Sequence, residues 1–247
     1  MQDIETQFPP SRSSRENAIV LVHGAWVGEW SWLPVLPQLV ASGRSVYAVS
    51  LKGHGARRHE SGPHVTLADH VADVLGVLET FDLAEVTLVG HSYGGRVITL
   101  AWQGAADRIA RLVYLDAHAP VAPDVGQSPE RDAKAAANGG MLPFGDYAPD
   151  PSEFGGDMGV AWFLERVVPQ SYATISEPFS TQLPDDLPKT YVHARSNGPS
   201  RFSGYAAAAR AHPAWDYREL KSSHWLMFAR PSETVDIILE CAARDKP

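Results

Sequence analysis

The stretch Glu85–Gly95, EVTLVGHSYGG, runs from an apolar segment into a serine flanked by glycines, and it decides the fold of this chain. Residues 85–90 have the β-branched and apolar character of a buried strand, and residues 94–104 have helical spacing. The Gly-x-Ser-x-Gly motif alone is a weak signal. Between a strand and a helix, however, it predicts a tight, strained turn that presents Ser92 as a candidate nucleophile.

Short apolar runs alternate with segments of helical period along the rest of the chain. This alternation predicts a parallel sheet with helices on both faces. The expected strands cover residues 18–22, 45–51, 85–90, 110–117, 189–194 and 216–220. The expected helices lie near residues 31–42, 66–81, 94–104, 200–211 and 232–244.

The expected helix near residues 66–81 has a recognisable start. Thr66 is followed three residues later by Asp69, which approximates a capping box. An apolar stripe follows it, formed by Val71, Val74, Leu75 and Leu78. The stripe predicts which side of this helix faces the core.

Charge and composition restrict the class of partner. The chain has 247 residues, of which 44% are hydrophobic, enough for one large α/β domain. Its formal net charge of -8 argues against affinity for nucleic acid or anionic membranes, which reward clustered Lys and Arg. We therefore expect a small-molecule substrate, no nucleic-acid partner and no membrane partner, while a homodimer stays open.

Cysteine content and the first residues suggest a compartment. Cys241 is the only cysteine, so neither an intrachain disulfide nor a thiolate zinc cluster can form within one chain. No apolar stretch reaches the roughly 20 residues that span a bilayer. Residues 1–17 are polar, lack the apolar segment of a signal peptide, and are expected to be a flexible leader. These features favour the cytoplasm.

The segment 118–188 interrupts the alternating pattern. It separates two expected strands by about seventy residues, far more than a crossover connection needs. It is rich in proline and aromatic residues, which favours a packed lid over a pocket. The expected division is therefore a core of residues 18–117 and 189–247 with a lid inserted at 118–188.

A serine nucleophile needs a base, and His224 is the best placed of the ten histidines. It follows the last expected strand, so its loop opens at the same edge of the sheet as Ser92. His91 is expected to pack under the turn, and His54 to line the site. The histidines expected at the surface are His59, His64, His70 and His212.

An oxyanion formed at Ser92 would need two backbone N–H donors. Tyr93, directly after the serine, is expected to supply one of them. Ala25, in the His23–Trp26 loop after the first strand, is expected to supply the other.

Together these motifs resemble the α/β-hydrolase fold, and within it the small esterases grouped with methyl-salicylate esterases, EstC-like esterases and hydroxynitrile lyases. The resemblance extends from Ile19 to Leu239. It rests on LVHGAWVGEWSW (21–32), LKGHGARRH (51–59), VGHSYGG (89–95), LVYLDAHAP (112–120) and SSHWLMFARP (222–231). It implies about six predominantly parallel strands, a helical lid, and a Ser-His-Asp hydrolase that cleaves small esters without metal or cofactor.

The lyase branch of this group fits the residues poorly. Its members resemble one another in a Glu before the nucleophile, a threonine in the oxyanion loop and a Lys after the catalytic histidine. This chain has His91 and Trp225 at the first and last of these positions and no threonine near His23. Cleavage of a cyanohydrin is therefore not expected.

The acid of the triad departs from the pattern of the fold. Its usual loop, YVHARSNGPSRF (191–202), contains no carboxylate. Asp116 is the expected substitute, because it follows a buried strand next to the turn and would be costly to bury alone. Asp216 is the second choice, although it should lie at the opposite edge of the sheet, and Asn197 could orient the imidazole as a neutral acceptor.

Three kinds of function stay open on this scaffold. The leading hypothesis is hydrolysis of an ester with a small, largely apolar or aromatic group, held by Trp26, His54, Trp162 and Trp225. Carbamates, amides and lactones would be cleaved by the same chemistry. The others are a ligand receptor with little turnover and a cofactor-free lyase or oxygenase in which Ser92 only orients the substrate.

Overall fold

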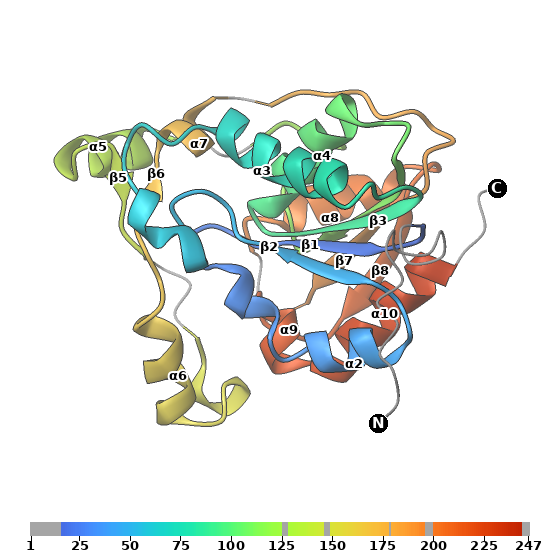
Figure 1. Cartoon of the computed structure of the whole chain (residues 1–247). Helices are drawn as coiled ribbons and strands as arrows, with labels where there is room; N and C mark the ends of the chain where they lie inside the picture. The colour runs from blue at the N-terminus through green and yellow to red at the C-terminus, as the bar shows by residue number, and fades with distance from the viewer. Residues whose placement is uncertain (1–15, 125–127, 146–148, 178, 196–199, 244–247) are drawn as a thin grey trace, which may run out of the picture.

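A parallel β-sheet lies at the centre of the molecule with helices on either side (Figure 1). The computed structural model describes residues 16–124, 128–145, 149–177, 179–195 and 200–243, and within them this sheet has six strands in the order β2-β1-β3-β4-β7-β8. The strands are β1 (Ile19–Val22), β2 (Val46–Val49), β3 (Val86–His91), β4 (Ile109–Leu115), β7 (Lys189–Ala194) and β8 (Asp216–Leu220). All neighbouring pairs run parallel, so their carboxyl ends share one edge. The predicted α/β-hydrolase fold is confirmed.

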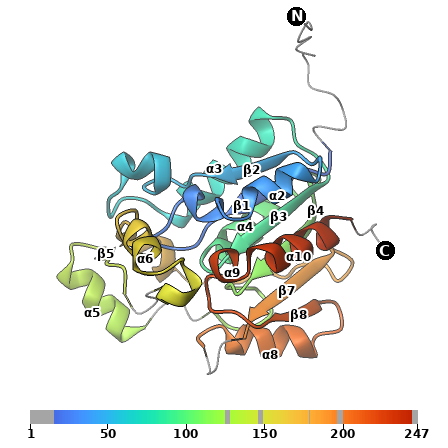
Figure 2. The ribbon, with the colours of Figure 1, turned by 90° about the horizontal axis from the view of Figure 1, so that it is seen from below.

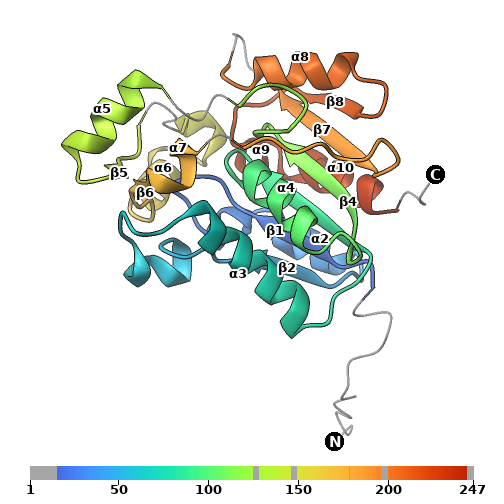
Figure 3. The same ribbon diagram turned by 90° about the horizontal axis from the view of Figure 1, so that it is seen from above.

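Helices cover both faces of the sheet. One face carries α3 (Leu67–Thr80), α4 (Gly94–Gly104) and α8 (Ser203–Ala211), seen in front in Figure 3. The other carries α2 (Leu36–Ala41), α9 (Leu226–Ala229) and α10 (Pro231–Ala243), seen in front in Figure 2. The helix expected near 31–42 is instead a 3₁₀ turn, η1 (Glu29–Trp32), followed by α2. Pro37 sits at the start of α2, because proline in a helix interior would remove a hydrogen bond and clash.

The capping box of α3 is confirmed. The Asp69 N–H donates to Thr66 Oγ1 at 3.2 Å, and the Thr66 N–H donates to Asp69 Oδ2 at 2.8 Å. Val74 and Leu78 of the predicted stripe are buried, and Val71 and Leu75 are partly buried against the core. Leu67 and His70 complete the buried side of the helix. A histidine therefore takes a core position in this helix.

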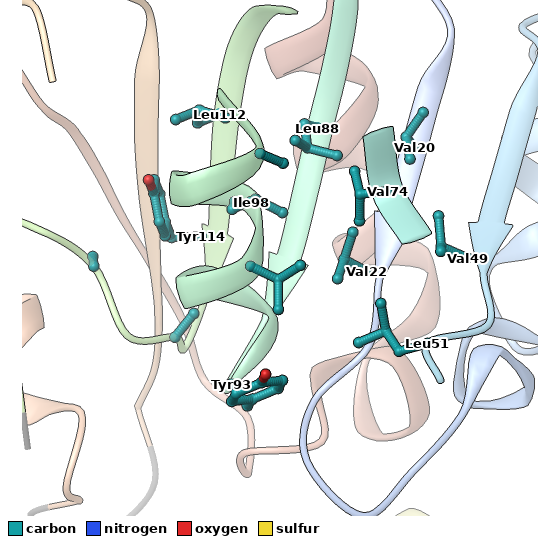
Figure 4. Packing of buried hydrophobic residues seen from close by; sticks show 14 of the residues in the cluster. Val20, Val22, Val49, Leu51, Val74, Leu88, Tyr93, Ile98, Leu112 and Tyr114 are labelled. Carbon is teal, nitrogen blue, oxygen red and sulfur yellow. The ribbon is translucent and has the colours of Figure 1, made fainter. Parts of the chain in front are cut away.

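Both faces of the sheet are apolar, as expected for a parallel sheet enclosed by helices. Alternate residues of each strand point to opposite faces, so each strand contributes to two cores. On the α3 and α4 side the packed residues include Val20, Val22, Leu88, Ile98 and Tyr114 (Figure 4). On the α2 and α10 side they include Ile19, Leu21, Val89, Trp32 and Ile238.

Cys241 belongs to the second of these cores. Its side chain is buried in α10, and its Sγ lies 3.5 Å from Thr190 Oγ1 of β7. The thiol is thus part of the contact between helix and sheet.

Most of the segment 118–188, as far as α7 (Ala173–Ser176), lies beyond the carboxyl ends of the strands, and its last residues return over α4 to the start of β7 (Figures 1 and 3). A small antiparallel sheet of β5 (Met141–Leu142) and β6 (Gln170–Ser171) links its two halves. Its helices are α5 (Pro129–Ala137), η3 (Pro151–Glu153), α6 (Asp157–Leu164) and α7 (Ala173–Ser176). The remaining 3₁₀ turn of the described residues, η2 (Gly55–Glu60), follows β2. None of the helices in the described ranges has the length and apolar character needed to cross a bilayer.

Candidate active site

Ser92 occupies the sharp turn between β3 and α4. Its φ of 53° lies in the left-handed region, which is uncommon for residues other than glycine. The Ser92 N–H donates to the Leu115 carbonyl of β4 at 3.2 Å, which ties the turn to the neighbouring strand. A Cβ at Gly94 would lie 2.5 Å from the Val22 carbonyl oxygen, and one at Gly95 would collide with the His118 carbonyl oxygen. The predicted tight turn is present, and a side chain at position 94 or 95 would collide with the neighbouring backbone.

His224 and Asp116 meet at the same edge of the sheet. His224 Nδ1 and Asp116 Oδ2 are 2.7 Å apart. The Ala194 N–H donates to the other carboxylate oxygen at 3.3 Å, while the Asp116 N–H donates to the Val192 carbonyl at 2.7 Å. Asp116 is 1% exposed and has a φ of 42°, so the backbone holds it in a left-handed turn directed at the histidine.

Burial shapes the protonation of this pair. It lowers the pKa of His224 well below the ordinary value, an effect to which His118 adds, so the imidazole is neutral at pH 7. With Nδ1–H donating to Asp116, Nε2 is left as the basic nitrogen. Burial raises the pKa of Asp116, and the nearby His193 and the Ala194 N–H oppose that rise. The pair thus joins a neutral imidazole to a carboxyl group within hydrogen-bond distance.

Aromatic rings surround the His224 imidazole. Phe202 stacks on it with ring centroids 4.9 Å apart and an interplanar angle of 4°. His91, fully buried under the turn as predicted, lies 4.6 Å from it, and His91 Nε2–H donates to the His224 carbonyl oxygen at 2.8 Å. His91 therefore links the strand before Ser92 to the loop that carries His224. Sequence reasoning missed Phe202, because nothing in its local pattern indicates a partner in a distant loop.

The loop after β1 reaches the Ser92 turn. A Cβ placed on Gly24 would lie 3.0 Å from the Cβ of Ser92, so a side chain there would require the turn to shift by a few tenths of an ångström. Within the described residues, the N–H groups of Ala25 and Tyr93 have no hydrogen-bond acceptor. The next residue, Trp26, has a φ of 66° and donates its N–H to Gln170 Oε1 at 3.2 Å. The oxyanion role of Ala25 and Tyr93 stays a prediction.

His70 corrects one expectation. It was expected at the surface but is fully buried in α3, with Nε2–H donating to the Lys52 carbonyl at 2.9 Å. Its Nδ1 accepts from the Tyr93 hydroxyl at 2.9 Å, and burial lowers the pKa of His70 to about 3. The Tyr93 side chain is therefore anchored from α3. The other three histidines expected at the surface, His59, His64 and His212, are exposed.

The four residues expected to bind substrate lie in different surroundings. Trp26 lines a cavity of about 250 Å³, and Trp225 is buried beside His224, with ring centroids 5.4 Å apart. His54 is buried between His23 and His70, with ring centroids 5.5 and 5.6 Å away. Trp162, on α6, packs against Trp30 and Arg166. Their roles toward substrate stay predictions.

Asp216, the alternative acid, lies at the other edge of the sheet from His224. Asp216 begins β8 and pairs with Thr190 at the start of β7, so it lies at the amino edge of the sheet, as expected. Its carboxylate accepts from Arg218 at 3.1 Å. Asn197 falls outside the described residues.

A buried charged cluster ties the 118–188 segment to the core. Arg96 of α4 is fully buried, lies 3.4 Å from Asp124 and donates to the Ile175 carbonyl at 2.7 Å. It also donates to the Glu177 carbonyl. Asp124 in turn lies 2.9 Å from His118 Nδ1. Both ends of the segment are thus held by one side chain of the core.

The chain was compared with known proteins. Residues 19–237 match the model of the alpha/beta hydrolase family. Carbendazim hydrolyzing esterase of Nocardioides sp. (strain SG-4G) is 35% identical over 236 residues, which cover 88% of this chain and 96% of that protein. Methylesterase 3 of Arabidopsis thaliana is 36% identical over 121 residues, covering 48% of this chain and 45% of that protein. An extracellular alpha/beta-hydrolase from a Paenibacillus species superposes with a TM-score of 0.71 at 22% identity, covering 92% of this chain and 99% of that one.

Proposed function

Since the chain belongs to the alpha/beta hydrolase family and is an ester hydrolase, we propose that Ser92, His224 and Asp116 are its catalytic triad. The hydrogen bond of 2.7 Å between His224 and Asp116, at the edge of the sheet where Ser92 turns, carries this proposal. The three side chains and two backbone N–H groups supply every group that ester hydrolysis needs.

Acylation begins when Ser92 Oγ attacks the carbonyl carbon of the ester. The serine proton passes to His224 Nε2, which burial keeps neutral and therefore able to accept it. Asp116 stabilises the imidazolium that forms. The proton then moves from His224 to the departing alcohol oxygen, the carbon–oxygen ester bond breaks, and the acyl group remains on Ser92.

Deacylation repeats these steps with water. His224 takes a proton from water, the hydroxide equivalent attacks the acyl carbon, and the proton returns to Ser92 Oγ as the acid leaves. In both halves the N–H groups of Ala25 and Tyr93 donate to the oxyanion. One such donor typically contributes about 10²–10³-fold in rate. The absence of another acceptor for these two groups within the described residues supports this role.

The substrate is a small ester with an apolar or aromatic group, and the 118–188 segment covers it. The aromatic side chains of Trp26 and Phe144, with ring centroids 5.9 Å apart, support an apolar wall next to the oxyanion loop. The Nocardioides relative matches this chain over nearly the whole of its own length, and its name adds carbendazim to the compounds to be tested. Methyl and aryl esters complete the panel.

Ser92→Ala tests the mechanism directly. We expect the parent protein to hydrolyse at least one ester of the panel and to gain one covalent adduct on Ser92 with a fluorophosphonate, measured by mass spectrometry. Ser92→Ala should lose the adduct and about 10³–10⁴-fold or more of kcat, because the nucleophile is gone.

Ser232→Ala is the matched control, because Ser232 is exposed on α10. It should label and turn over like the parent. Turnover that survives in Ser92→Ala would instead indicate a cofactor-free lyase or oxygenase. A parent protein that is stabilised by a ligand without releasing product would indicate a receptor.

A further inference from the structure

The residue that follows Ala25 in the oxyanion loop is held by the 118–188 segment. Trp26 has a φ of 66°, a left-handed conformation that persists in a residue with a side chain only when its surroundings hold it. The Trp26 carbonyl accepts from the Val168 N–H at 2.9 Å, and the indole Nε1–H donates to the Leu142 carbonyl at 2.9 Å. The Trp26 N–H donates to Gln170 Oε1 at 3.2 Å. All three partners belong to the segment, so the segment stabilises this turn of the loop.

The Gln170 side chain is itself fixed in one orientation. It is fully buried in β6, and its Nε2–H donates to Thr174 Oγ1 at 2.6 Å. The Thr174 hydroxyl donates to the Ser171 carbonyl at 2.7 Å, so it can only accept from the amide of Gln170. The amide nitrogen therefore faces Thr174, and the amide oxygen faces the Trp26 N–H.

The peptide before Trp26 brings the loop to the serine. His23 Nε2 accepts from the Leu51 N–H at 3.3 Å, so Nδ1 carries the proton and donates to the Gly24 carbonyl at 2.8 Å. The carbonyl and the N–H of a trans peptide point in opposite directions, so the Ala25 N–H points away from the His23 ring. A Cβ on Gly24 would lie 3.0 Å from the Cβ of Ser92, which places this peptide beside the serine.

We propose that Gln170 is a positioning residue for the oxyanion donor. By accepting from the Trp26 N–H it holds the peptide between Ala25 and Trp26, and this keeps the Ala25 N–H directed at the oxyanion that forms on Ser92. The inference rests on the proposed function, since it concerns a donor of the same site. Without this contact the loop can relax from its left-handed turn, and the Ala25 N–H moves with it. The oxyanion exists only during the reaction, so the loss acts on kcat and not on KM.

Gln170→Met tests the proposal, because methionine fills a similar volume but lacks the amide oxygen. We expect kcat for the best ester of the panel to fall about tenfold, with KM changed less than twofold. The second measurement is inhibition by pentyl trifluoromethyl ketone, which forms a tetrahedral adduct with a catalytic serine. Its inhibition constant should rise about tenfold as well, because the adduct carries the same oxyanion. An inhibition constant does not depend on the fraction of folded protein, so the reading stays valid in a destabilised variant.

Two other substitutions of Gln170 sharpen the result. Gln170→Asn keeps a polar side chain at the buried position but is one methylene too short for the Trp26 N–H, so it should raise the inhibition constant as Gln170→Met does. Gln170→Glu keeps an acceptor oxygen of the same reach in either protonation state. It should therefore stay within about threefold of the parent in kcat and in the inhibition constant.

Ser171→Ala is the matched control. Ser171 is the next residue of β6 and is also buried, and its hydroxyl donates to the Val65 carbonyl at 2.7 Å. It thus attaches the same strand to the core through a contact outside the oxyanion loop. We expect Ser171→Ala to change kcat and the inhibition constant less than twofold.

An inhibition constant that is unchanged in Gln170→Met and Gln170→Asn would overturn this inference and leave the triad in place. An equal rise in Ser171→Ala would overturn it too, because the effect would then come from the attachment of β6 as a whole. Failure of the parent protein both to hydrolyse an ester of the panel and to bind the ketone would overturn the proposed function instead.

Discussion

The strand ends and the 118–188 segment border the same site, but they are held in different ways. At the strand ends, the backbone N–H groups of Ser92 and Asp116 are hydrogen-bonded to neighbouring strands. The backbone at Gly94 and Gly95 packs so closely against neighbouring segments that a side chain would not fit there. The 118–188 segment is joined to the core largely through side chains, among them Arg96 with its contacts to Asp124 and Ile175.

This difference separates two tasks. Reaction geometry needs positions fixed to within a fraction of an ångström, which a hydrogen-bonded sheet provides. Substrate choice can be altered by residues of a loop-rich segment that is held largely through side chains. We therefore expect changes at the strand ends to act on rate, and changes at Arg96 to act on the attachment of the segment.

The largest expected effect is that of Asp116→Asn on turnover. Loss of the carboxylate removes the group that orients His224 and stabilises its charged form, so kcat should fall about 10³–10⁴-fold. Steady-state hydrolysis of the best ester in the panel measures this. Asp216→Asn, at the opposite edge of the sheet, should change kcat less than twofold. Equal turnover in Asp116→Asn and the parent would show that another group orients the base.

Acid should act next most strongly, through the buried histidines beneath the strand ends. Burial lowers the pKa of His23, His70 and His91 below the ordinary value near 6.5. Above pH 6.5 these histidines are neutral in both the folded and the unfolded chain. Below pH 6.5 the unfolded chain takes up protons that the buried histidines do not, so the folded state loses stability. From pH 7.0 to 5.5 the free energy of unfolding should fall by about 4 kcal/mol for the three together.

Urea unfolding at several pH values checks this. His70→Gln should make the fall between pH 7.0 and 5.5 smaller by about 1 kcal/mol, whereas His59→Gln, at an exposed position, should leave it unchanged. A free energy of unfolding that stays constant between pH 7.0 and 5.5 would contradict the assignment of neutral, buried histidines.

Arg96→Met should weaken the attachment of the 118–188 segment. The variant leaves the carboxylate of Asp124 without its arginine, although His118 remains beside it. The free energy of unfolding should therefore fall by about 3 kcal/mol. Urea unfolding gives the loss, and limited proteolysis should show new cleavage within 118–188. Arg195→Met, which removes an exposed ion pair with Glu219, should cost well under 1 kcal/mol. If Arg96→Met and Arg195→Met lowered the free energy of unfolding by similar amounts, Arg96 would not be an important attachment of the 118–188 segment.

The smallest effect is expected for Thr66→Ala. It removes the side-chain cap of α3 and should lower the free energy of unfolding by about 1 kcal/mol, with kcat unchanged. Thr80→Ala, at the exposed far end of the same helix, is the comparison variant. A fall in kcat in Thr66→Ala would mean that α3 positions Tyr93 more directly than its contact through His70 suggests.

Sequence reasoning succeeded where a local pattern of residue types determines the backbone conformation. The strand, turn and helix around Ser92 were predictable because glycine spacing and apolar runs are local signals. The contact between Asp116 and His224 was predictable because a carboxylate after a buried strand needs a partner. The catalytic roles assigned to these residues stay predictions.

Contacts between distant segments were harder to predict. Phe202 stacks on His224 although the two residues belong to different loops, and such a contact leaves no pattern in the local sequence. His70 could have been recognised as buried, since positions 70, 74 and 78 share one helix face. The predicted apolar stripe included Val71 and Leu75 instead, because these residues are more apolar than histidine. Arg96 was missed because a charged residue on a helix usually faces solvent.

The buried position of Cys241 has a practical consequence for studying these two regions. A cysteine placed on the exposed face of α5 would be the only accessible thiol among the described residues. It could carry a fluorophore or spin label at a single site without removing the native residue. The signal of such a label would then report whether the surroundings of α5 change during turnover.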